Sequence, residues 1–507
     1  MTSTTEAAVR TTDRGALPAW WVGLCMVSAL LGAGTRIAAA DEYVGAAAAF
    51  SWCLVPIAAL PFTTKRGAVS FAHPWTVIFG LLLHGWVLRL TLVALDRRPT
   101  NTSSTMFPNG DTSIIDRGML WSFVGIVCLG TGYALTTLRK TTGGPTPLAP
   151  FHRADDPTMW RHGRMFFALT VVALLAAVGM YFLATSGGSA GLIGKRFNDI
   201  EGGSASRLGT GSYAYLRLAY LSHSVFIVLA LYRFKFGHIP GLYFKGLLIC
   251  TFAGAILGPL MSDSRAGVAL VIVDVVMLQI ILSGRVRMSR LWIVGAAAVA
   301  ALGAMLQLRR QTATSFGASI LDIFAGRDLF DIGKNAHILQ LPGSELGGQT
   351  LVGWLLLPFP QGLLPFDKPL FTGLGQYVWT NAYQASSRNG VPAGLIGELY
   401  LNFGLVGIIG GMLAFGVVIG LSYRMLARDL AEQRIVASVL MAIGLVRLIV
   451  FVLSNDLGTG VLSSLSDMLS ILALLAFIVP RPRRSKCREQ PRSRRRIDRL
   501  TVDTAGD

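Results

Sequence analysis

The segment LIGELYLNFGLVGIIGGMLAFGVVIGLSY at residues 395–423 decides the fold class, because Glu398 is the only charged residue in an otherwise apolar run. As a helix this run is long enough to cross the ~30 Å hydrocarbon core of a bilayer. Glycine and alanine are abundant within such runs of the chain, as close helix packing in lipid favours. The segment therefore predicts a transmembrane helix.

Working outward, similar runs recur along all 507 residues, of which 52% are hydrophobic and 14% charged. These values indicate a polytopic membrane protein. The predicted spans lie at about 19–39, 43–62, 75–95, 118–138, 165–185, 213–233, 243–261, 266–284, 290–308, 395–423, 434–453 and 459–479. The runs are continuous rather than alternating, which excludes a β-barrel. The expected fold class is all-α, with about twelve transmembrane helices.

Basic residues indicate the orientation in the membrane. Lysine and arginine fall in alternate connections and in the tail after residue 480, and cytoplasmic loops carry such an excess. This pattern predicts a multi-pass plasma-membrane protein with both termini in the cytoplasm. It also accounts for most of the net charge of +18, so nucleic acid is not an expected partner.

The predicted organisation has five parts and no soluble domain. A cytoplasmic tail (1–18) precedes nine helices (19–308), a large extracytoplasmic loop (309–394), three helices (395–480) and a basic cytoplasmic tail (481–507). None of the five cysteines falls in an outer loop, so neither a disulfide framework nor a cysteine metal site is expected there. No nucleotide-binding motif occurs in a supporting context, and no cofactor is expected.

The large loop carries cations on the side of the membrane where they are normally sparse. An anionic ligand at the outer face would explain Arg309, Arg310, Arg327 and Arg388. Three loop segments are expected to be ordered. Residues 318–340 predict an amphipathic helix with a break at Gly326, residues 351–366 an interfacial or re-entrant segment, and QYVWTNAYQ at 376–384 a sugar-contacting surface.

Other outer residues have a functional and a structural interpretation. Arg265, in the tight turn SDSRAG, would hold a phosphate with its guanidinium fork or extend its charged end to the interface. Arg196 lies in a glycine-rich loop that would wrap a diphosphate or remain solvated. Asp41 and Glu42 form either an acidic site or a polar connector.

Ionisable residues at or within the spans are the other candidates. His337 and Glu398 are the candidate general bases, and each has a plainer interpretation as a surface residue or an ion-pair partner. Arg89, Arg217 and Arg447 lie within predicted spans, where a charge faces a partner or a wet cavity.

Three local features resemble the bacterial oligosaccharide repeat-unit polymerases, also called O-antigen polymerases of the Wzy type. They are SDSRAG at 262–267, PFPQGLLPFDKP at 358–369 and NGVPAGLIGELYLNFGLVGI at 389–408. The third is the most specific, because its Gly-Glu-Leu-Tyr sequence opens a late span directly after the large loop. The order of spans and loops is also similar to that family.

The resemblance implies a metal-independent membrane glycosyltransferase acting on undecaprenyl-diphosphate-linked oligosaccharides, surrounded by membrane lipid and working with a chain-length regulator and a flippase. Outer-face cations would stabilise the diphosphate leaving group. This set is Arg265, Arg309, Arg310, Arg327, Arg388 and Arg196. Glu398 or His337 would take the proton of the acceptor hydroxyl. Two alternatives stay open: a polyprenyl-phosphate-dependent glycosyltransferase or ligase that needs Asp41 or Glu42, and a flippase or transporter of lipid-linked glycans that uses Arg217, His223 and Arg447.

Overall fold

A computed structural model of the chain describes residues 19–59, 73–95, 107, 110–137, 162–186, 211–239, 241–261, 265–283, 296, 330–356, 374–383, 391–431, 435–455 and 457–479. Within these ranges the protein is helical and contains no strand. Eight of the described helices are long and apolar enough to cross a membrane. The predicted all-α membrane architecture is therefore confirmed, whereas the count of twelve spans and the side of each terminus stay predictions.

The long helices follow the predicted spans closely. In chain order they are α1 (Ala19–Ala38), α2 (Glu42–Ala59), α3 (Pro74–Leu82) continued by the π-helical η2 (Leu83–Leu88) and α4 (Arg89–Leu95), α6 (Ile114–Thr137), α7 (His162–Ser186), α9 (Gly211–Phe236), α10 (Gly241–Met261), α11 (Arg265–Ser283), α17 (Gly394–Ala431), α18 (Ile435–Ser454) and α19 (Leu457–Ile478). The predicted span at 290–308 lies outside the described residues, apart from Ala296. Three short helices precede α17: α14 (Ile332–Ile338), α15 (Gln349–Leu356) and α16 (Leu374–Asn381).

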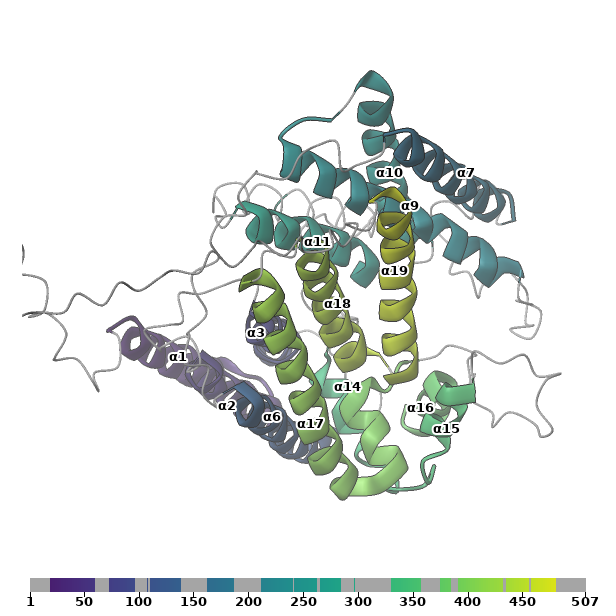
Figure 1. Ribbon diagram of the computed structural model, residues 1–507. Coiled ribbons are helices and arrows are strands. Elements are labelled where there is room, and N and C mark those ends of the chain that lie inside the picture. Colours follow the sequence, from purple (N-terminus) through teal and green to yellow (C-terminus); the bar gives the residue numbers. More distant parts are fainter. Residues whose placement is uncertain are drawn as a thin grey trace, which may run out of the picture.

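Two apolar cores hold the bundle together. The first is formed mainly by α2, α3, η2, α4, α6, α14, α17 and α18, and the second mainly by α7, α9, α10, α11, α18 and α19. Because α18 contributes to both cores, it joins the two halves of the bundle, as Figure 1 shows.

Helices α6 and α17 pack through glycines at very close range. A Cβ added at Gly132 of α6 would collide with the backbone of Leu413, and one added at Gly416 of α17 would collide with the backbone of Leu129. Small residues allow this backbone contact, which is typical of helix packing in lipid. The seam fixes α17 against α6.

Helix α17 is broken at Gly404, which corrects the prediction of one continuous span at 395–423. Gly404 has φ 63° and ψ −150°, a conformation that non-glycine residues rarely adopt. The segment 394–403, here called the half-helix, turns back so that Leu399 lies against Gly407 and Gly411 (Figure 1). The long part of α17 therefore starts after the break. Glu398 belongs to the half-helix rather than to the start of a span.

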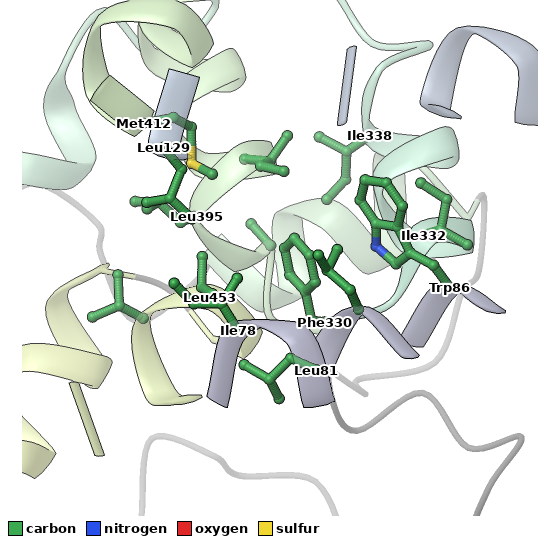
Figure 2. Packing of buried hydrophobic residues seen from close by; sticks show 14 of the residues in the cluster. Ile78, Leu81, Trp86, Leu129, Phe330, Ile332, Ile338, Leu395, Met412 and Leu453 are labelled. Carbon is green, nitrogen blue, oxygen red and sulfur yellow. The ribbon is translucent and has the colours of Figure 1, made fainter. Parts of the chain in front are cut away.

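Helix α14 lies inside the bundle, although the sequence predicts an amphipathic helix over 318–340. All seven of its residues are buried, and in the described part of that range the helix covers only Ile332–Ile338. Just before it, Phe330 stacks on Trp86 of η2 with ring centroids 5.6 Å apart (Figure 2). Gly326 and the rest of the predicted helix lie outside the described residues. Burial on every side explains why a helix of only seven residues is stable here.

Candidate functional site

The site is built around α14 at the end of the bundle where the large loop enters, here called the loop-side end. Three segments meet there: the turn between α1 and α2, the end of α4, and the residues just before α6. Ala40 N donates to Ala94 O, and the Thr112 hydroxyl donates to Asp41. The turn between α18 and α19 lies at the same end, since Phe330 N donates to the Ser454 hydroxyl at 3.3 Å. Helix α14 therefore anchors the described part of the large loop between spans that are far apart in sequence.

Charged and polar side chains fasten α14 in place. Asp331 begins the helix by accepting from Gly333 N, and its other oxygen lies 2.9 Å from Nη1 of Arg89, with both side chains 1% exposed. Lys334 donates to Ser454 O at 2.8 Å, and the Asn335 amide donates to Ser122 Oγ at 2.9 Å. The intramembrane Arg89 thus has an ion-pair partner, one of the two interpretations that the sequence left open.

His337 lies among aromatic rings at the loop-side end. Its ring centroid is 4.4 Å from that of Tyr383 and 6.5 Å from that of Phe107. Trp379 of α16 stacks on Tyr383 with ring centroids 5.5 Å apart and is partly exposed. The structure therefore brings the candidate base together with the aromatic segment that the sequence associates with sugars. His337 itself is only 5% exposed.

Tyr377 of α16 belongs to the same aromatic segment, 376–384. Its hydroxyl donates to Glu345 in a short hydrogen bond. Burial raises the pKa of Tyr377, and the hydrogen bond and negative charge of Glu345 raise it further, so the phenol keeps its proton at neutral pH. Glu345 is thereby fixed beside the aromatic segment and adds an acidic group to the site.

Glu398 is buried, 2% exposed, and both of its carboxylate oxygens accept hydrogen bonds. Oε1 accepts from the Thr350 hydroxyl at 2.8 Å, and Oε2 accepts from Leu457 N at the start of α19. The amide of Asn402, one turn further along the half-helix, donates to Thr350 Oγ1 at 2.5 Å. Glu398 therefore ties the half-helix to α15 and α19. These contacts give Glu398 an anchoring role, whereas its role as a general base stays a prediction.

Two substitutions distinguish the two roles of Glu398. Glu398→Gln keeps groups that can pair with Thr350 and Leu457 N, so we expect near-normal stability and activity if the residue is an anchor. Glu398→Ala leaves the partly buried Leu457 N–H and the buried Thr350 hydroxyl without this partner and should cost about 1–3 kcal/mol. Thermal unfolding and activity of both variants check this expectation. Loss of activity in a stable Glu398→Gln protein would instead support the general base.

The predicted diphosphate-binding arginines are only partly placed. Arg265 is the first residue of α11. Arg309, Arg310, Arg327, Arg388 and Arg196 lie outside the described residues, so their role as a group stays a prediction. Sequence reasoning missed Arg117, an exposed residue near the start of α6 whose Nη2 donates to the Tyr400 hydroxyl at 3.3 Å. It is the last residue of the connection between the predicted spans 75–95 and 118–138, and this position could have identified it.

The acidic pair of the first turn has local partners. One oxygen of Asp41 accepts from Val44 N and so caps α2, while the other accepts from Thr112. Glu42 is exposed and pairs with Arg36 at 2.9 Å. These contacts correspond to the connector interpretation of Asp41 and Glu42. Within the described ranges, no group of three or more His, Cys, Asp or Glu residues is placed to hold a metal ion.

A second polar site lies deep in the bundle. His223 of α9, Asp274 of α11, Arg447 of α18 and Asp467 of α19, here called the charge cluster, each lie in the interior of their helix. Arg447 donates through Nε and Nη2 to Asp274 Oδ2 at 3.1 and 2.6 Å, and through Nη1 to Asp467. His223 Nε2 lies 3.0 Å from Asp274 Oδ2. Arg447 thus has the buried partners expected of an intramembrane cation.

Sequence reasoning identified the basic members of the charge cluster and missed the acidic ones. Asp274 and Asp467 are isolated carboxylates in apolar runs, a signal as strong as an isolated arginine. Arg217 lies in the first turns of α9, but its side chain falls outside the part of the chain that the structure describes, so its predicted role stays a prediction.

Comparison with known proteins gives no family for this chain. No family model, no curated protein and no solved structure matches it.

Proposed function

We propose that the protein is a membrane glycosyltransferase that polymerises lipid-diphosphate-linked oligosaccharide repeat units into a surface polysaccharide at the outer face of the plasma membrane. The observation that supports this proposal is the placement of His337. The buried α14 holds its imidazole against Tyr383, and Tyr383 stacks on the partly exposed Trp379. Aromatic rings of this kind give a sugar an apolar face to lie on, next to a group that can accept a proton.

In the proposed reaction the hydroxyl of the acceptor sugar attacks the anomeric carbon of the lipid-linked donor. His337 takes the hydroxyl proton, a new glycosidic C–O bond forms, and the bond to the lipid diphosphate breaks. The diphosphate leaves with the electron pair, so nearby cations lower the barrier by stabilising its charge. The exposed Arg117 and Arg265, of which the structure describes only the place at the start of α11, are proposed for this role. Arg309, Arg310, Arg327, Arg388 and Arg196 complete the proposed set.

One observation favours a second candidate function. The charge cluster lies mid-bundle, where a flippase or transporter of lipid-linked glycans would need polar groups. The ligase or polyprenyl-phosphate interpretation has less support, since Asp41 caps α2 and Glu42 pairs with Arg36.

The test is a gel of surface glycan from a strain that lacks the gene, complemented with wild type, Arg265→Ala or His337→Ala. The matched control is Arg36→Ala, which removes an arginine exposed near the turn between α1 and α2. We expect deletion to reduce a polymer ladder to single repeat units. The two site variants should fail to restore the ladder at normal membrane levels, and the control should restore it. Accumulation of single units on lipid inside the cell would contradict polymerisation and support transport.

A further inference from the structure

The charge cluster has a charge imbalance that the proposed glycosyl transfer does not use. Arg447 supplies one positive charge, whereas Asp274 and Asp467 supply one negative charge each. With a neutral His223, one negative charge stays uncompensated. The environment is buried: the side chain of Asp274 is fully buried, and those of Arg447 and His223 are 5% exposed.

An uncompensated charge in such a place is costly. Removing an ion from water costs several kcal/mol even after the surroundings relax, unless a partner compensates it. In addition, Oδ1 of Asp274 is buried and has no hydrogen-bond partner among the described residues. The cluster therefore lacks one positive charge, and the bare Oδ1 of Asp274 offers a buried acceptor for a proton.

We propose that the charge cluster is a proton-binding site, in which one exchangeable proton is shared among His223, Asp274 and Asp467. The proton comes from water and adds to a nitrogen or oxygen lone pair, which makes the cluster neutral. A metal cation fits less well, because the Arg447 guanidinium already occupies the space between the two carboxylates. This proposal stands on the cluster alone and does not depend on the glycosyltransferase function.

The proton belongs to the cluster as a unit rather than to one residue, since the groups are in direct contact. The titratable and charged groups that face each other are His223 and Tyr220 from α9, Asp274 from α11, Arg447 from α18 and Asp467 from α19. Asp467 is the most accessible of the four cluster members, with a side chain 21% exposed. We therefore expect exchange with water through Asp467.

The location gives the proton a structural role. Arg447 lies two helical turns, about 10 Å, from Ser454 at the end of α18. Ser454 holds Lys334, and Leu457 at the start of α19 holds Glu398. The helices that carry the cluster thus also hold the loop-side end.

The experiment uses the full-length protein in mixed micelles. Its unfolding equilibrium is measured over a series of pH values, together with infrared difference spectra between acidic and alkaline buffer. A native state that holds the extra proton is most stable at low pH. It loses that stability between the pH at which the unfolded chain releases the proton and the higher pH at which the native cluster releases it. For one proton, the unfolding constant should rise about tenfold per pH unit within this range.

The decisive variant is Asp467→Asn, in which Arg447 and Asp274 balance each other without a proton. Its unfolding constant should not show the tenfold rise per pH unit, and its infrared spectrum should lack the bands of the bound proton. The control Glu42→Gln removes an exposed carboxylate and should behave as wild type. If Asp467→Asn does not fold, His223→Gln serves instead, and the proton signal should then move to a carboxylic acid band. Wild-type spectra in a folded cluster variant would overturn the proposal.

Discussion

Arg447→Met is expected to destabilise the protein by about 3–5 kcal/mol, because it leaves the fully buried Asp274 and the partly buried Asp467 without their cation. Methionine fills a similar volume, so the loss reflects charge rather than a cavity. The free energy of unfolding in mixed micelles measures the effect. The charge cluster connects α9, α11, α18 and α19, so unfolding should begin in the half of the bundle that contains the second apolar core.

The matched control removes the acids together with the cation. The triple variant Arg447→Met, Asp274→Asn, Asp467→Asn has no uncompensated charge, and we expect it to regain most of the lost stability. Buried ion pairs can often be replaced by neutral groups at little cost, whereas the removal of one partner is severe. A single variant as stable as wild type, or a triple variant no better than the single, would contradict the assignment of these partners.

The sequence predicts the membrane architecture well because hydrophobic length is a local property. Each described long helix overlaps a predicted span, although α17 is broken at Gly404. The expectation that intramembrane arginines face partners is confirmed for Arg89 and Arg447. The identity of those partners could not be predicted. Asp331 and Asp274 are distant in sequence from the arginines that they neutralise, and composition gives no information on which helices become neighbours.

The candidate site shows the same limit. The sequence singles out His337 and the aromatic segment at 376–384 separately, and only the fold brings Tyr383 onto the imidazole. The expected amphipathic helix at 318–340 is wrong in the described part because tertiary burial overrides the polar pattern of α14. The polar residues of α14 donate hydrogen bonds to buried partners such as Ser122 and Ser454 instead of facing water.

The second large effect is expected at Gly407, where the half-helix meets the rest of α17. A Cβ at Gly407 would collide with the carbonyl oxygen of Leu399 and lie 2.7 Å from Phe403 Cβ. The backbone of Leu399 cannot move aside as the end of a side chain can. Gly407→Ala should therefore cost about 1–3 kcal/mol of stability or push the half-helix away from the rest of α17. The half-helix carries Glu398, so its displacement also breaks the bond to Leu457 and should impair the activity of the loop-side end.

Gly410, three residues along the same helix, provides the control, because nothing lies within 4 Å of a Cβ built there. Gly410→Ala should leave stability unchanged or raise it by up to about 1 kcal/mol, since alanine is the better helix former. Thermal unfolding and limited proteolysis of the two alanine variants measure the difference. Equal stability of both would mean that Leu399 does not pack on Gly407. A selective loss in Gly407→Ala would establish that the glycines after the break allow the chain to turn back and hold Glu398 at the candidate site.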